Sequence, residues 1–215
     1  MAEEDIIQQG REQRLMTLAL ADQIHGARWH EPALPGGVTV HAMLSHLLGW
    51  DEWLIATLEM SATRELPAKL VAAYREVDAF NARSVARYAN VSRDDLLGAL
   101  QGTSARVVSS ALAAGGAEWA QRRIPDLAPP PAEQDGQQAI EPSRGPTVGG
   151  ILRMLREHER NHCEEFSAAL GVSVDMEQLR ADLTGEARVA GEREKGADRP
   201  PTPRATEQPQ APGLP

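Results

Sequence analysis

The chain has 215 residues, of which 41% are hydrophobic, 25% charged and only 4% aromatic. Lys and Arg together number 22 against 31 Asp and Glu, giving a formal net charge of −9 at pH 7. An acidic surface repels phosphate backbones, so we expect no nucleic-acid partner. The apolar residues are mostly Ala, Leu and Val, which favours helices over strands.

Cysteine content and hydropathy indicate in which compartment the protein is expected. Cys163 is the only cysteine, so neither an intrachain disulfide nor a Cys-rich zinc site is available. The first residues are acidic and lack the cationic start and apolar run of an export signal. Nowhere are there about 18 consecutive apolar residues, the length a membrane helix needs. We expect a cytoplasmic protein without a membrane partner.

Helical periodicity and capping residues predict the elements in chain order. Thr39 and Thr147 are expected N-caps, Ser92 opens a capping box with Asp95, and Gly171 is the expected helix stop. No segment shows convincing period-two alternation. The predicted helices are 4–24, 39–60, 68–89, 92–114 and 147–170.

These elements predict an all-α fold, a four-helix bundle with one crossover helix. The proline-rich segment 124–146 is either a functional lid or a surface loop. From residue 172 onward the composition turns to Pro, Gly and charged side chains, which cannot bury enough apolar surface to fold. We therefore expect a bundle domain over 1–171 and a largely disordered tail over 172–215.

Two histidines interrupt the buried stripe of the last helix. Continued at about 100° per residue, the stripe passes from apolar side chains onto polar ones. His158 and His162 are four residues apart, so their rings lie on one face, one turn apart. A lone inward histidine is usually a satisfied core residue, but two adjacent buried imidazoles each need a partner. The stripe consists of Val148, Ile151, Leu152, Leu155, His158, Glu159, His162 and Phe166.

A third ligand has to come from another helix, and His46 is the candidate. It borders the apolar stripe of the second helix; the competing interpretation is a boundary histidine packed on Trp50. Three neutral imidazoles leave an open coordination position, as in catalytic zinc sites. Zinc is the first choice, with nickel, iron or manganese as alternatives.

Acidic residues near these histidines are candidate supports for the ligands, because a ligating histidine usually passes its other N–H to a carboxylate or carbonyl. Glu159 is the best placed. Asp51 also falls within an apolar stripe, and a buried salt bridge to an arginine is the competing explanation. The remaining candidates are Glu157 and Glu165, and the histidines expected at the surface are His25, His30 and His41.

The motifs HLLGWDEW and HERNHCEEF, with the stretch AYREVDAFNARSVARYANVSRDDLLGAL between them, resemble the DinB-type four-helix bundle superfamily. That group includes the mycothiol-dependent maleylpyruvate isomerase domains and the ClbS/DfsB branch. The resemblance covers about residues 5–170 and implies an up-down-down-up bundle with a divalent metal on His46, His158 and His162. An acid can replace the middle ligand in the isomerase branch, which keeps Glu157 and Glu159 as fallbacks.

The resemblance also implies chemistry. The leading hypothesis is a metal-dependent transferase or hydrolase acting on a small electrophilic metabolite or toxin, with a low-molecular-weight thiol such as mycothiol or bacillithiol. Cys163 could supply that sulfur itself, although a solitary helical cysteine is usually an apolar filler. The candidate substrate-pocket residues are Trp50, Trp53, Asn81 and Tyr88.

Two alternatives remain open. One is a self-protection protein of the ClbS/DfsB kind, which binds or hydrolyses a DNA-damaging natural product without needing a metal. In the other, an interaction module forms a homodimer through a helix face and performs no chemistry.

Overall fold

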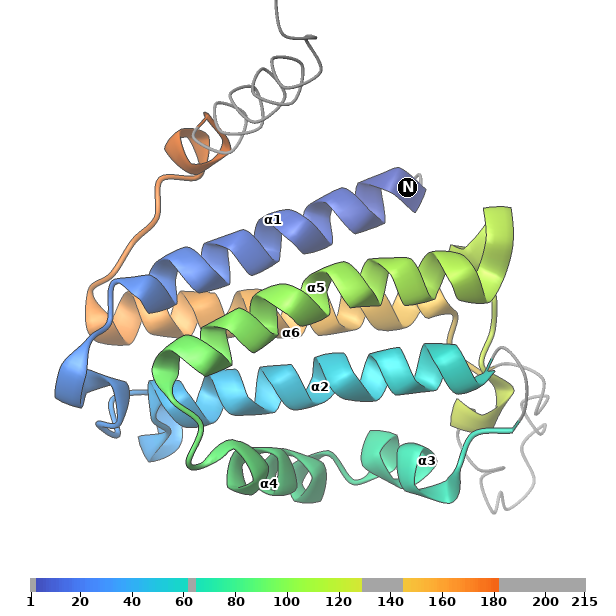
Figure 1. Ribbon diagram of the computed structural model, residues 1–215, viewed down its shortest axis with the longest axis horizontal. Helices are drawn as coiled ribbons and strands as arrows, with labels where there is room; N and C mark the ends of the chain where they lie inside the picture. The colour runs from blue at the N-terminus through green and yellow to red at the C-terminus, as the bar shows by residue number, and fades with distance from the viewer. Residues whose placement is uncertain (1–2, 62–64, 129–144, 182–215) are drawn as a thin grey trace, which may run out of the picture. The chain divides into compact units, whose positions relative to one another are not determined.

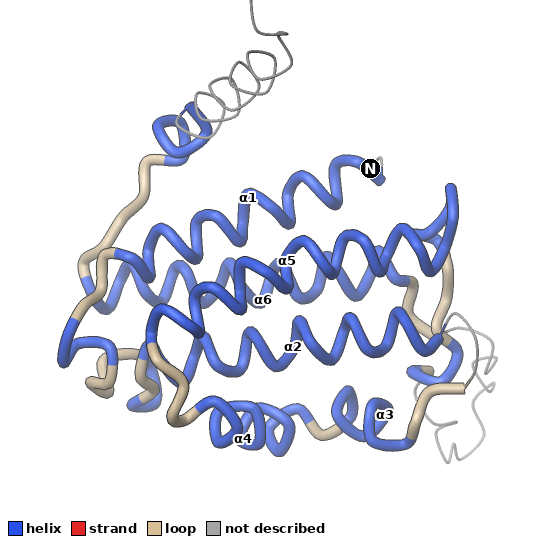
Figure 2. The backbone as a smooth tube through the Cα atoms, in the orientation of Figure 1, coloured by secondary structure: helices blue, strands red, loops and turns tan. Residues whose placement is uncertain are grey.

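A computed structural model describes residues 3–61, 65–128 and 145–181 (Figure 1). In this part of the chain the regular structure is helical, and the only β pairing consists of two isolated bridges (Figure 2). The long helices are α1 (Glu3–Asp22), α2 (Val40–Ser61), α5 (Arg93–Gly115) and α6 (Val148–Leu170). The shorter helices are α3 (Ala68–Arg75) and α4 (Val77–Tyr88), with 3₁₀ turns η1 (Gly26–Trp29), η2 (Pro35–Gly37), η3 (Gly116–Gln121) and η4 (Pro125–Leu127).

The predicted capping residues are confirmed. Thr39 and Thr147 each accept a hydrogen bond from the amide three residues later, at 3.0 Å. Ser92 accepts one from the Asp95 amide at 3.2 Å and donates to its carboxylate at 2.6 Å. Gly171 ends α6 in the left-handed region, with φ 64°. Local sequence therefore determines where α2, α5 and α6 begin.

The long helices form the predicted up-down-down-up bundle (Figure 1). Helices α1 and α6 run in one direction, and α2 and α5 run together in the other, because the α3–α4 crossover returns the chain to the starting end. The closest packing is within the α1/α6 and α2/α5 pairs, and the contact between α2 and α6 is sparser. The fold class is therefore confirmed.

The crossover differs from the expected single helix over 68–89. It breaks at Glu76, whose φ −111° and ψ 60° are not helical, so α3 and α4 are separate helices. Helix α4 packs closely on α2 at Gly49, where an added Cβ would lie 2.2 Å from the hydroxyl of Ser84. The break lets each short helix bury its own face, Leu70 and Ala73 in α3 and Ser84 with Tyr88 in α4.

The apolar core is divided into two clusters along the bundle. One surrounds Leu44 and Phe166 near the starts of α2 and α5, and the other surrounds Leu58 and Ile151 toward their ends. Polar side chains of α1, α2 and α6 lie between the two clusters. This polar layer is where the candidate site lies.

The bundle forms a compact unit of residues 1–174, and residues 175–215 form a second unit. The bundle therefore extends slightly beyond the expected boundary at 171, because Val172 is buried and Val174 packs against the core. The tail is expected to be largely disordered from residue 172, but residues 176–181 are helical, and the chain from 182 onward lies outside the described residues. The lid or loop expected over 124–146 contains η4 near its start, and its residues 129–144 lie outside the described residues. None of the described helices is long and apolar enough to cross a membrane.

Candidate metal centre

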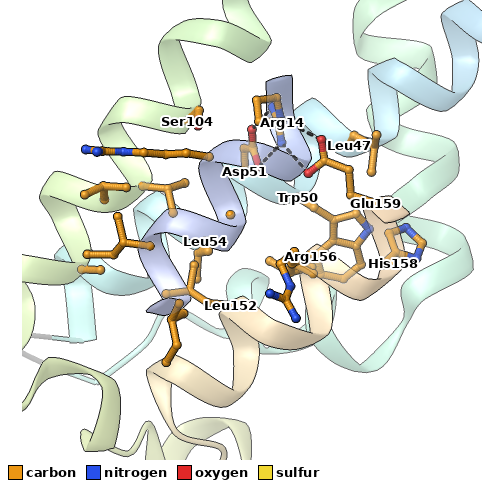
Figure 3. Close-up of a pocket in the computed structure, with 18 residues that line it drawn as sticks. Arg14, Leu47, Trp50, Asp51, Leu54, Ser104, Leu152, Arg156, His158 and Glu159 are labelled. Carbon is orange, nitrogen blue, oxygen red and sulfur yellow. Dashed lines mark hydrogen bonds and ion pairs between the residues drawn. The ribbon is translucent and has the colours of Figure 1, made fainter. Parts of the chain in front are cut away.

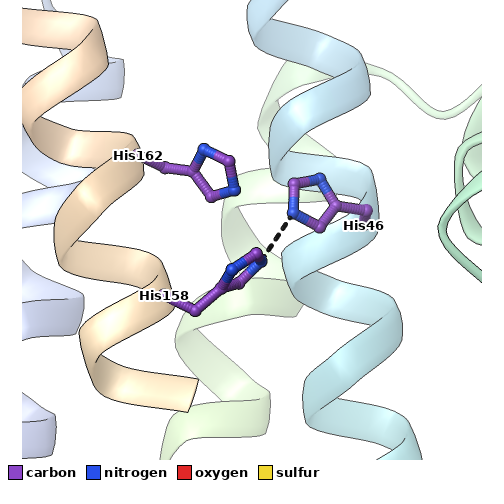
Figure 4. A group of neighbouring side chains, drawn as sticks. All are labelled: His46, His158 and His162. Atoms are coloured by element: carbon purple, nitrogen blue, oxygen red, sulfur yellow. Dashed lines mark hydrogen bonds between the residues drawn. The ribbon is translucent and has the colours of Figure 1, made fainter. Parts of the chain in front are cut away.

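The three histidines predicted from the sequence meet inside the bundle (Figure 4). His46 projects from α2, and His158 and His162 project from α6 toward it. One ring nitrogen of each lies within 4.8 Å of the others. The Nε2 atoms of His46 and His158 are 3.0 Å apart. Imidazoles from two separate helices therefore converge on one point.

The position of these rings follows from the helices that carry them. In α6 the buried Val148 and Ile151 begin the stripe that continues to His158 and His162, as the period predicts. In α2 nearly every side chain from Met43 onward through the middle is buried, because α4, α5 and α6 all pack on it. His46, which is 8% exposed, therefore projects into the interior.

His162 is held in place by Glu165. Its Nδ1 lies 2.7 Å from the Glu165 carboxylate, so this nitrogen donates and the ring is fixed in orientation. The opposite nitrogen, Nε2, is buried and has no hydrogen-bond partner among the described residues. A buried polar atom without a partner is costly, and here it is directed at the other two imidazoles.

The protonation of the rings suits ligation. Burial, followed by the neighbouring His162 and His158, lowers the pKa of His46 to about 3. Burial and His162 lower the pKa of His158 to about 4, against the opposing effect of Glu165. Both rings are therefore neutral near pH 7. A neutral imidazole offers a nitrogen lone pair, which is the form that binds metal ions.

These observations fit a divalent metal ion. The donors are convergent imidazoles, one of them carries a buried nitrogen with no other partner, and its ring is backed by a carboxylate. Three protein ligands leave room for an exogenous one. The three histidines would thus be the protein's ligands to such an ion.

Glu159 was expected to support the histidines, but its carboxylate hydrogen-bonds other residues. Its carboxylate accepts hydrogen bonds from Arg14 at 2.8 Å and from Thr17 at 2.5 Å (Figure 3). Asp51 takes the other side of the same guanidinium, at 2.7 Å, and also accepts from Thr103. The salt-bridge explanation weighed for Asp51 is confirmed. The carboxylate that supports an imidazole is that of Glu165, a weaker candidate in the sequence.

Arg14 is the residue that sequence reasoning missed. It is 6% exposed and lies in the middle of α1, where a charged residue is normally assigned to the polar face. Burial by itself lowers the pKa of its guanidinium, but Asp51 and Glu159 outweigh burial and keep that pKa above its usual value. The sequence did contain a signal for it: Asp51 and Glu159 are expected on the inner faces of α2 and α6, and a buried carboxylate needs a cation as its partner.

Glu157, the other fallback ligand, is exposed and pairs with Arg160 at 3.2 Å on the same helix. An ion at the histidines therefore has no nearby oxygen ligand from either fallback acid. The positions of Glu157 and Glu159 therefore do not support the fallback in which an acid takes the place of a histidine.

The four expected substrate-pocket residues do not share one pocket. Trp50 lines a cavity beside His158 (Figure 3). Its indole N–H donates to Asn81 at 2.9 Å. Trp53 instead lines a separate groove between α2 and the crossover, with its N–H on the Leu70 carbonyl. Tyr88 packs in the core cluster around Leu44. Only Trp50 is placed to touch a molecule next to the histidines.

His25 and His30 are exposed as expected, but His41 is not. Its side chain is buried at the start of α2, and its Nε2 donates to the Val91 carbonyl at 3.1 Å. The η1 turn is the reason, since Trp29 and His30 both pack against the His41 ring. A helix period alone does not reveal a loop that covers the helix start.

Cys163 lies between α1 and α6, away from the point where the imidazoles converge. Its sulfur accepts a hydrogen bond from Gln13 at 3.3 Å and lies 3.2 Å from the Thr17 hydroxyl. Burial raises the pKa of this thiol to about 11. Because the thiolate is the nucleophilic form, Cys163 is a buried packing residue.

Comparison with known proteins gives one match. A family model described as the DinB superfamily matches residues 9–166, which includes all three histidines. Searches of curated proteins and of solved structures found no match.

Proposed function

Because the chain belongs to the DinB superfamily and brings three imidazoles together, we propose that it is a metal-dependent enzyme. The observation that carries the proposal is the buried Nε2 of His162, which has no partner in the described chain while Nδ1 is held by Glu165. Buried ring nitrogens are normally hydrogen-bonded. Unlike the unpaired Nε1 of Trp29, Nε2 of His162 faces two further imidazoles.

In this proposal His46, His158 and His162 are the ligands, and Glu165 is a positioning residue that fixes the His162 ring. Zinc is the preferred ion because three nitrogen donors with one open position match its catalytic sites; nickel, iron and manganese are alternatives. A divalent ion bound there supplies Lewis acidity next to Trp50 and the cavity that it lines.

We further propose that the reaction is transfer of a thiol, or of water, to a small electrophile. The one thiol of the chain, that of Cys163, is buried with its pKa raised to about 11, so it is not a ready nucleophile for the site. The attacking group therefore comes from a second molecule, such as mycothiol, bacillithiol or water. What this protein's own residues contribute is the orientation of three rings beside a cavity whose walls include Leu54 and Leu152.

Elemental analysis tests the proposal. Protein prepared without a metal-affinity tag, dialysed against trace zinc, should hold one ion per chain, and His162→Ala should hold at least tenfold less. His41→Ala is the matched control, because His41 is also a buried histidine but bonds a backbone carbonyl. No stoichiometric metal in the wild type, or equal metal in His162→Ala, would contradict the proposal.

A second candidate is metal-independent binding of an apolar toxin. The cavity beside Trp50 favours it, because a cavity binds without chemistry. Tryptophan fluorescence titration with a candidate electrophile separates the two candidates. Stoichiometric quenching without product supports sequestration, and product that requires the metal supports the enzyme.

A further inference from the structure

A cavity of about 80 Å³ lies inside the bundle, between α1, α2, α5 and α6 (Figure 3). One of its walls includes His158 of the proposed metal centre. The exposed Arg11 also lines it, so the cavity reaches the surface beside α1. Its walls are mostly apolar, and these side chains include Trp50 and Leu54 of α2, Val107 of α5 and Leu152 of α6.

Gly10 helps to open this cavity, at the seam where α1 packs on α5 more sparsely than on α6. Glycine weakens the interior of a helix relative to alanine, yet Gly10 lies inside α1 with an ordinary helical backbone. An added Cβ there would meet no heavy atom within 4 Å. Since neither backbone conformation nor a close contact requires glycine, the missing side chain leaves space in the cavity.

The buried charges in the cavity wall are bonded to one another. A guanidinium group has five N–H donors, and Arg14 uses all five, in hydrogen bonds of 2.7 to 3.2 Å. Two reach Asp51, two reach Glu159 and one reaches the carbonyl of Leu100. Arg14 therefore has no N–H left for a ligand, and both carboxylates already have their cation.

The other polar groups of the wall are also turned to other uses. Arg156 donates to the side-chain amide of Gln9, and Arg11 is exposed, so water solvates its charge. The indole N–H of Trp50 donates to Asn81 of α4 at 2.9 Å. An ion that entered the cavity would lose its water without gaining a partner of opposite charge, which costs free energy.

The volume limits what fits. An engineered apolar cavity of about 150 Å³ binds benzene or xenon and stays free of water. This cavity has roughly half that volume. It therefore suits a single xenon atom or a small branched hydrocarbon group, and it is too small for a ring system.

We propose that this cavity binds a small uncharged apolar group, which enters between α1 and α5. As a statement about the substrate, the inference rests on the proposed function, because His158 lies in the cavity wall. It assigns the substrate class: an electrophile with a short alkyl or alkenyl end that carries no charge.

The test uses xenon, iodide and caesium, which are isoelectronic and differ in charge. Methyl NMR spectra are recorded on zinc-loaded and metal-free protein during titration with each probe. Xenon should shift the methyl signals of Leu54, Val107 and Leu152 saturably, while the exposed Leu112, which does not line the cavity, should not respond in this way. Iodide and caesium should shift the three cavity methyls at least tenfold less.

Gly10→Leu should weaken xenon binding at least tenfold, because its side chain occupies the cavity. Gly102→Leu is the matched control, since Gly102 is an exposed helical glycine of α5 that also has no heavy atom near an added Cβ. It should bind xenon as the wild type does. Ser104→Leu fills the same cavity from α5 and replaces Gly10→Leu if that variant does not fold.

The outcomes separate the two proposals. No saturable xenon response in the wild type, or equal responses in Gly10→Leu and Gly102→Leu, would overturn the cavity proposal. Iodide or caesium shifts as large as those of xenon would overturn its uncharged character. Zinc content, measured on the same samples, reports on the proposed metal centre alone, so xenon binding by a protein that takes up no zinc would contradict the enzyme and leave the cavity standing.

Discussion

The carboxylate of Glu165 lies 2.7 Å from Nδ1 of His162, one turn further along α6. Carboxylate partners of this kind fix the ring and increase the basicity of the ligating nitrogen. Glu165→Ala is expected to weaken zinc affinity about 10–100-fold. The zinc affinity of Glu165→Gln should lie between those of the wild type and Glu165→Ala, because the amide oxygen still accepts a hydrogen bond from Nδ1 but carries no charge. Competition with a chromophoric chelator measures both affinities.

The control for this prediction is Glu164→Ala. Glu164 is exposed on the same helix and lies 3.8 Å from Arg160, so its removal should leave zinc affinity unchanged. Equal losses in Glu164→Ala and Glu165→Ala would show that the effect comes from the surface charge of α6 rather than from the His162 ring.

Arg14 is expected to dominate the stability of the polar layer. Its removal in Arg14→Met leaves Asp51 and Glu159 buried without a cation. Breaking a buried ion pair in this way costs about 3–5 kcal/mol. Urea unfolding of the metal-free protein measures the change. Arg160→Met, which breaks only exposed pairs with Glu157 and Glu164, should change the free energy of unfolding by about 1 kcal/mol or less.

Stability should fall in acid partly because of the histidines. The pKa of His46 is lowered from 6.5 to about 3, and that of His158 from 6.5 to about 4. Below pH 6.5 the unfolded chain takes up protons at these rings and the folded chain does not until the pH approaches the lowered values. The free energy of unfolding of the metal-free protein therefore decreases as pH falls from 6.5 toward 4.

A His46→Leu, His158→Leu double variant isolates this contribution. Carboxylates also titrate in acid, so the quantity to compare is the slope of unfolding free energy against pH in the two proteins. The variant should show a shallower slope between pH 6.5 and 4. An identical slope would mean that these imidazoles take up protons equally in the folded and unfolded states, which would contradict the lowered pKa values.

Cys163 should be inert in the folded protein. Its side chain is 2% exposed and its thiol pKa is raised to about 11, so at pH 8 little thiolate forms and reagent has no access. Ellman's reagent should react with less than a tenth of an equivalent in the native state and with one equivalent in guanidinium chloride. Rapid reaction of native protein would instead place the sulfur at the surface.

Sequence reasoning succeeded where a local signal decides the structure. The N-caps Thr39 and Thr147 act within four residues of themselves, and the four-residue spacing of His158 and His162 places both rings on one helix face. It failed at Glu76, where residues of ordinary helical propensity form a break because the two halves of the crossover pack separately. Tertiary packing overrides propensity at such positions.

The same limit applies to the candidate site. The helix period correctly predicted that Glu159 faces the interior, but it does not identify the residue that Glu159 contacts there. That residue is Arg14 rather than a histidine. His41 was assigned to a polar face, yet the short η1 turn covers it. In each case the missing information is a contact between segments far apart in the chain.

The sparse contact between α2 and α6 has a mechanical consequence. The bundle consists of two well-packed halves, α1/α6 and α2/α5, and the imidazoles cross the seam between them. A bound ion would link the two halves across this sparse contact. Loading would then suppress separation of the halves and raise resistance to unfolding in proportion to the logarithm of free ion concentration. Protein without the ion would therefore unfold more readily than protein that holds it.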